Sequence, residues 1–89
     1  MTDNPAPLLN FPCDFPIKAF GHSRADFDLI IAEIVRRHAP DLGADAIAVR
    51  PSKGGKYTAV TITVRASSKA QLDAIYSDLS ASADVIMAL

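Results

Sequence analysis

The segment from Lys56 to Ala66 constrains the fold more than any other part of the chain. Between Val60 and Val64, β-branched aliphatic residues occupy every second position, and threonine fills the positions between them. A period of two with β-branched side chains is typical of a β-strand that buries one face and leaves the other open. The fold must therefore contain a sheet with one face packed against a core.

A helix is predicted shortly after Ser23. Apolar residues from Phe27 to Val35 recur at offsets of 3, 4, 7 and 8, which places them on one stripe of an α-helix. Ser23 and Asp26 have the spacing of a capping box, so we expect Ser23 to be the N-cap of this helix. Two arginines complement the helix dipole in the last turn, and Pro40 ends the helix.

The remaining elements follow from the same two periods. A second helical stripe runs from Leu72 to Leu79, in a helix that begins near Ser67 or Ser68. Three further strands are predicted, at residues 15–21, 46–50 and 83–89. The order strand, helix, strand, strand, helix, strand is that of the ferredoxin-like βαββαβ sandwich, an α+β fold. It has a four-stranded antiparallel sheet with two helices on one face, so the other face must meet water or a partner.

The length of 89 residues is enough for one domain with one core. Residues 1–10 hold two prolines and no regular period, so we expect a flexible lead-in followed by a single domain at residues 11–89. The one cysteine, Cys13, cannot form an internal disulfide, which is typical of a reducing compartment. No signal-peptide pattern and no membrane-length apolar run is present, so a cytoplasmic protein with no membrane contact is expected.

The net charge of −1 is distributed unevenly along the chain. Residues 46–72 have a balance of +5 with no acidic residue, and the remainder has a balance of −6. This pattern predicts either a basic patch that attracts an anionic partner or ordinary solvated strand and turn ends. The basic residues of this segment are Arg50, Lys53, Lys56, Arg65 and Lys69.

The sequence RPSKGGKYTAV raises the question of a phosphate-binding loop. A Walker-type loop needs serine or threonine after its Gly-Lys pair and then a helix. Here Tyr57 follows, and the chain continues into a strand. Pro51 to Lys56 is therefore predicted to be a hairpin turn in which glycines supply positive φ. Arg50, Lys53, Lys56 and Tyr57 would form its basic tip.

RNA binding by this basic hairpin and the sheet is an alternative. RNA recognition motifs share the strand and helix order, and aromatic residues of their third strand stack on bases. Tyr57 is the only aromatic residue here that matches that motif, and Phe20 could supply a second ring on the open face. Nucleic acid is therefore not the expected partner.

No metal, cofactor or catalytic site is predicted. One cysteine and two histidines, His22 and His38, do not have the spacing of a zinc site. His38 continues the apolar helix stripe and is expected to pack or cap there. Ser23 and His22 are adjacent and seldom point at one another, so they do not suggest a nucleophile and its base. Because no acid, base and nucleophile converge, the chain is not expected to be an enzyme.

The loop GHSRAD between the first strand and the first helix is a second candidate site. Gly21 permits close backbone approach, and the helix N-terminus behind it offers free N–H groups to a carboxylate, with Arg24 assisting. The alternative interpretation is a tight turn with a satisfied cap.

Several blocks of the sequence resemble one known family. FPCDFPIKAFG, RRHAP, VRPSKGGKYTAVTITV and QLDAIYSDL, followed by an apolar C-terminal strand, are similar to the YbeD family of small uncharacterised bacterial proteins. The resemblance covers residues 8–89 and implies an ACT-like, ferredoxin-like fold without an established enzymatic activity. Lys53 stands where the family commonly has a second serine, so a role for that hydroxyl does not transfer.

ACT domains are regulatory modules that bind small molecules, often amino acids, at the loop after the first strand. By position, the resemblance implicates Gly21, His22, Ser23 and Arg24 in binding an amino-acid-like ligand. This is an analogy between folds, because one fold hosts many functions.

The leading hypothesis is a non-enzymatic regulatory or protein-interaction module that uses the open face of the sheet. The occupant would be a partner protein or a second copy of the chain, because this face mixes small, threonine and apolar side chains. Alternation places five residues there: Phe20, Ala48, Thr61, Thr63 and Ile86.

Overall fold

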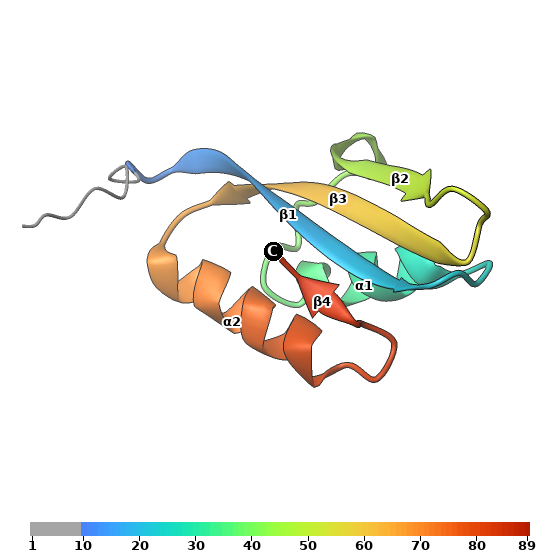
Figure 1. Cartoon of the computed structure of the whole chain (residues 1–89). Helices are drawn as coiled ribbons and strands as arrows, with labels where there is room; N and C mark the ends of the chain where they lie inside the picture. Colours follow the sequence, from blue (N-terminus) through green and yellow to red (C-terminus); the bar gives the residue numbers. More distant parts are fainter. Residues whose placement is uncertain (1–9) are drawn as a thin grey trace, which may run out of the picture.

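The computed structural model describes residues 10–89 (Figure 1). Of the predicted lead-in at residues 1–10, all but Asn10 lies outside the described residues. A short 3-10 turn at Ala44–Ala46 precedes the second strand. The strands are β1 (Cys13–His22), β2 (Ile47–Pro51), β3 (Tyr57–Ala66) and β4 (Met87–Ala88), and the helices are α1 (Phe27–Arg36) and α2 (Lys69–Ala81).

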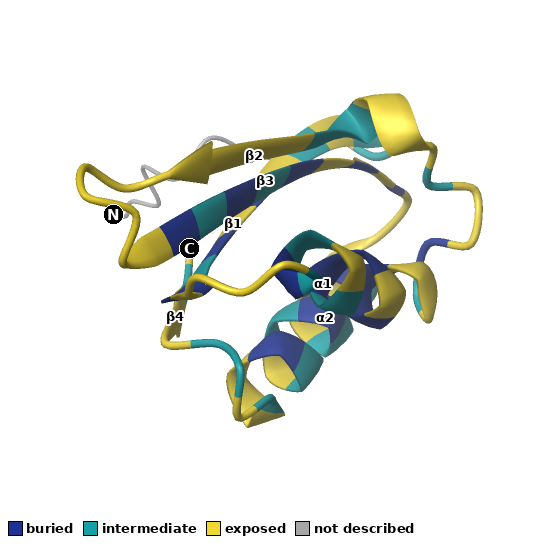
Figure 2. Ribbon diagram, turned by 90° about the vertical axis from the view of Figure 1, so that its right-hand side faces the viewer, coloured by how far each residue is buried: buried dark blue, intermediate teal, exposed yellow. Residues whose placement is uncertain are grey.

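The four strands form one antiparallel sheet in the order β2-β3-β1-β4. β1 and β3 pair over their whole length, from Cys13 opposite Ala66 to His22 opposite Tyr57. Both helices lie against the same face of this sheet (Figure 2). The prediction of a ferredoxin-like α+β fold is therefore confirmed.

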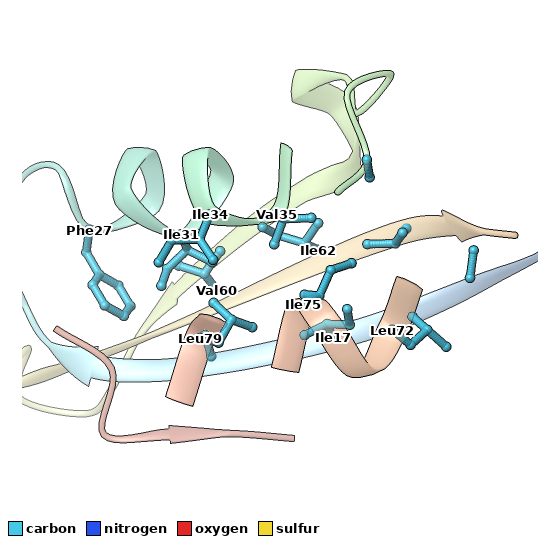
Figure 3. Packing of buried hydrophobic residues seen from close by; sticks show 14 residues of the cluster. Ile17, Phe27, Ile31, Ile34, Val35, Val60, Ile62, Leu72, Ile75 and Leu79 are labelled. Carbon is cyan, nitrogen blue, oxygen red and sulfur yellow. The ribbon is translucent and has the colours of Figure 1, made fainter. Parts of the chain in front are cut away.

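The core lies between this face and the two helices (Figure 3). Alternate residues of β3 point into it, and Val60, Ile62 and Val64 have no exposed surface. Each fully buried side chain of this size stabilises the fold by about 1.5–3 kcal/mol. The stripes predicted from periodicity supply the helical half of the core: Phe27, Ile31, Ile34 and Val35 from α1, and Leu72, Ile75 and Leu79 from α2.

The predicted N-cap of the first helix is wrong. Asp26, not Ser23, is the N-cap of α1, and its side chain makes no capping hydrogen bond. The Ser23 hydroxyl instead bonds the hydroxyl of Thr58 in β3, with 2.8 Å between the two oxygens. A serine hydroxyl in a turn can bond either the helix backbone or another neighbour, and here the tertiary structure brings Thr58 closer. The cap predicted near the second helix is present, since the Ser68 hydroxyl accepts a hydrogen bond from the Gln71 amide at 3.1 Å.

Two strand predictions need correction. β1 begins at Cys13, two residues before the predicted start, because β3 is long enough to pair with it there. The predicted strand at residues 83–89 shrinks to Met87–Ala88. A turn begins at Ser82, whose hydroxyl accepts a hydrogen bond from the Asp84 amide and whose carbonyl accepts one from the Val85 amide. The chain is therefore not extended before Ile86.

Neither α1 nor α2, the helices of residues 10–89, has the length and apolar character needed to cross a bilayer.

Candidate functional site

Gly21 lies at the end of β1, in the loop that the sequence suggested as a ligand site. It is buried, and neighbouring atoms already fill the space that a side chain would need. A Cβ atom at this position would lie 2.5 and 2.6 Å from two ring carbons of Phe27, and closer still to the Asp84 carbonyl oxygen. Close packing of strand, helix and C-terminal loop therefore explains this glycine without a ligand.

The polar groups of the same loop are bonded within the protein. Arg24 Nε donates to Asp26 Oδ1 at 2.6 Å, and Arg24 Nη1 donates to Asp84 Oδ1 at 3.0 Å. The hydrogen bond and charge of Asp26, with a further contribution from Asp84, raise the pKa of the Arg24 guanidinium. The Ser23 amide donates to the Lys56 carbonyl at 3.0 Å, which ties the loop to the β2–β3 hairpin.

His22 is exposed at the same end of the sheet, and its ring centroid lies 5.1 Å from that of Tyr57. The structure thus places Gly21 and His22 at the end of β1 and Ser23 and Arg24 in the loop that follows, and it gives Gly21, Ser23 and Arg24 contacts inside the protein. A ligand at this loop stays a prediction.

The β2–β3 connection is a hairpin, as predicted. Gly54 and Gly55 have φ values of 90° and 77°, a conformation that glycine adopts without steric cost. The Ser52 hydroxyl accepts a hydrogen bond from the Tyr57 amide at 3.0 Å, and the Ser52 amide donates one to the Tyr57 carbonyl at 2.7 Å. Lys56 Nζ lies 5.6 Å from the centre of the Tyr57 ring, within the range of a cation–π contact. The RPS…GKY pattern thus has a structural explanation.

An open groove of about 740 Å³ lies at the opposite end of the sheet, and the sequence did not predict it. The α1–β2 loop forms one wall of the groove. The RHAP block after the first helix supplies three of the lining residues, so it is the part of the sequence that could have indicated the groove. His38 Nε2 lies 2.6 Å from Asp78 Oδ2, and Gln71 Nε2 donates to the His38 carbonyl at 2.7 Å. Charged and polar residues of the lining include Asp14, His38, Asp45, Thr63, Arg65 and Gln71.

Gln71→Ala is expected to lower the free energy of unfolding by about 2 kcal/mol, because its side chain makes two hydrogen bonds to the backbone and each contributes about 1 kcal/mol net. The Gln71 side chain joins the His38 carbonyl to the Ser67 amide, with 2.7 Å for each bond. Urea unfolding measures the change. Ser77→Ala serves as the control on the exposed side of the same helix, and an equal loss in both variants would contradict a structural role for Gln71.

The open face of the sheet is defined by register. Arg50, Ala59, Phe20 and Met87 lie side by side across β2, β3, β1 and β4. The neighbouring row contains Ala48, Thr61 and Lys18. Leu89 completes this second row. It exchanges two backbone hydrogen bonds with Lys18, at 2.8 and 2.9 Å, and such a pair of residues is directly opposite.

Ile86 does not belong to this face in the way the sequence predicted. It lies in a bend one residue before β4, where strand alternation does not apply, and the residue beside Phe20 is Met87. Of the other predicted residues, Phe20, Ala48 and Thr61 lie in adjacent positions, and Thr63 follows opposite Pro16. A role for them in binding stays a prediction.

Large apolar side chains reach solvent on this face. Met87 is 52% exposed and Leu89 is 62% exposed, although both lie in or next to a strand. Tyr57 is 39% exposed at the hairpin end of β3, and Phe20 is half-buried between Ala59 and Met87. We call the set Lys18, Phe20, Arg50, Tyr57, Ala59, Thr61, Met87 and Leu89 the open-face patch.

Comparison with known proteins identifies the family. The family model described as "Protein of unknown function (DUF493)" matches residues 6–89. The chain belongs to this family. A UPF0250 protein of Chromobacterium violaceum is 44% identical, with the whole of both chains covered. A UPF0250 protein of Pseudomonas paraeruginosa is 42% identical over the same full extent, and one of Paraburkholderia phymatum is 49% identical over 78% of each chain.

One solved structure shows the same fold. Protein HP0495 from H. pylori matches with a TM-score of 0.73 and 14% sequence identity, covering 98% of this chain and 91% of the other. At this identity the likeness concerns the fold alone. The resemblance to the YbeD family and to its ferredoxin-like fold is therefore confirmed, and the relatives are uncharacterised.

Proposed function

We propose that this DUF493 chain is a non-enzymatic interaction module that binds a partner protein through the open face of its sheet. The single observation that carries the proposal is the open-face patch. Two strand-end side chains, Met87 and Leu89, keep more than half of their surface in solvent on the face opposite both helices.

The shape of this face supports the proposal. Small side chains at Ala48 and Ala59 lie beside Thr61 and Phe20, so a partner can approach the sheet closely. Burial of apolar surface is the main favourable contribution in most protein–protein association. Exposed apolar groups that gather on one face are typical of an interaction site.

The alternative of a small-ligand sensor at residues 21–24 receives less support. Gly21 has no free space, and Arg24 is held by two carboxylates. A ligand carboxylate would have to displace Asp26 or Asp84 from the guanidinium. The interaction module is therefore the function that the geometry favours.

Thr61→Tyr is expected to weaken partner binding by about tenfold or more, because a bulky uncharged ring would stand in the middle of the interface. Binding is measured as the recovery of proteins crosslinked to the immobilised chain in a lysate of the source bacterium. Ser77→Tyr is the matched control, since Ser77 is exposed on α2. Partner recovery that is equal for both variants and for the unaltered chain would overturn the proposal.

A further inference from the structure

The charge of the open face identifies the kind of partner it fits. We propose that the occupant of the open-face patch is an acidic segment of a partner protein that also carries apolar side chains. This inference rests on the proposed function, because it names the partner of the same surface.

Several basic residues gather on the open face and on the hairpin beside it. Lys18 and Arg50 lie on the open face, and the adjoining hairpin adds Lys53 and Lys56. None of these four residues takes part in an ion pair within residues 10–89.

The acidic residues lie elsewhere. In β1 to β4 the only acidic side chain is Asp14, which shares this face with Arg65 and approaches it to 3.4 Å. The described part of the chain has eight other acidic residues, and all of them lie in the helices, the turns or the loops. The open face and its hairpin are thus positive on a molecule whose net charge is −1.

A second copy of the chain does not fit this surface. In a two-fold dimer the same patch meets itself, so the positively charged patch of one copy, with Lys18 and Arg50, would meet the positively charged patch of the other. Like charges brought together at an interface destabilise it. The face therefore favours a partner of opposite charge over self-association.

The apolar part of the patch favours a polypeptide over nucleic acid. Single-stranded nucleic acid is bound by aromatic rings on which bases stack. The most exposed apolar groups here are the aliphatic side chains of Met87 and Leu89, while Phe20 is half-buried. Tyr57 is already in contact with His22 and Lys56. Aliphatic groups beside ammonium and guanidinium groups complement leucine-like and glutamate-like side chains.

The test is an NMR titration of the full chain with four probes. They are an amphipathic helical peptide of leucine, glutamate and glutamine, its counterpart with lysine for glutamate, a short single-stranded RNA, and the unlabelled chain itself. We expect the acidic peptide to shift the signals of Phe20, Ala59, Thr61 and Met87, and the basic peptide to leave them unchanged. Binding of the acidic peptide should weaken as salt is raised, because the charges of the face are exposed.

Charge variants test the residues directly. Lys18→Gln combined with Arg50→Gln should weaken binding of the acidic peptide by about tenfold. Arg37→Gln combined with Lys69→Gln removes two positive charges away from the open face, one just after α1 and one at the start of α2, and should change binding by less than about twofold. Equal losses would show that net charge, rather than this face, attracts the peptide, and would overturn the inference.

Three further outcomes of the titration would contradict an acidic partner. Tighter binding of the RNA than of the acidic peptide, dimer formation through the same signals, or no shift with the acidic peptide would each overturn the inference. The proposed function is judged separately, because Thr61→Tyr blocks the face without changing charge. If Thr61→Tyr abolishes partner recovery while the acidic peptide leaves the face unchanged, the interaction face stands and its acidic partner is wrong.

Discussion

Phe27→Ala is expected to lower the free energy of unfolding by about 3–5 kcal/mol, the range measured for removal of a buried aromatic ring. Phe27 is the first residue of α1 and is only 1% exposed. Its ring fills the space above Gly21, where two of its carbons occupy the region that a Cβ would need. Truncation leaves a cavity at the junction of β1, α1 and the loop before β4, and relaxation fills such a cavity only in part.

Urea unfolding followed by far-UV circular dichroism measures this loss. Leu29→Ala is the control, because Leu29 lies in the same helix and is 66% exposed. An exposed site of this kind changes stability by no more than about 0.5 kcal/mol. A cost for Phe27→Ala below about 2 kcal/mol would contradict the packing of this junction, since truncation of even a smaller buried side chain such as leucine to alanine costs at least about that much.

The core was predictable because its patterns are repeated and strong. The alternation around Ile62 and the stripe around Ile31 each determine which side chains face inward, whatever the tertiary partners are. Both patterns agree with the observed burial. The hairpin was predictable for a similar reason, since Gly54 and Gly55 lie between two strands, and the turn needs the positive φ that glycine supplies.

The errors lie where a single tertiary contact overrides a local pattern. Ser23 has the spacing of a cap but bonds Thr58, which is 35 positions away in sequence. The short β4 depends on the turn at Ser82, and its register decides that Met87 rather than Ile86 adjoins Phe20. A two-residue strand carries no alternation long enough to reveal that register in advance.

Part of the candidate site was predictable and part was not. The outward position of Thr61 follows from alternation within one strand. Leu89 joins the open-face patch only through its hydrogen bonds to Lys18, a contact between the first strand and the C-terminal residue. The groove beside His38 depends on the path of the α1–β2 loop, and irregular segments have no period from which their path follows.

Gly21→Ala is expected to lower the free energy of unfolding by about 3 kcal/mol, near the upper end of the range for overpacking a well-packed site. The backbone of Gly21 does not need a positive φ, so the loss would come from collision rather than from backbone strain. The new methyl group would overlap the Phe27 ring and the Asp84 carbonyl oxygen. Urea unfolding again gives the change in stability.

A double-mutant cycle with Phe27→Leu distinguishes packing from ligand binding at this glycine. Leucine is smaller than the aromatic ring, so the double variant should be more stable than the sum of the two single changes predicts, by about 0.5–3 kcal/mol. Recovery should be incomplete, because the Asp84 carbonyl belongs to the backbone and cannot rotate away. If Gly21 instead served only to admit a ligand, Gly21→Ala would leave the stability of the free protein unchanged, and the two substitutions would be additive. Coupling between them would assign Gly21 to the packing of the fold.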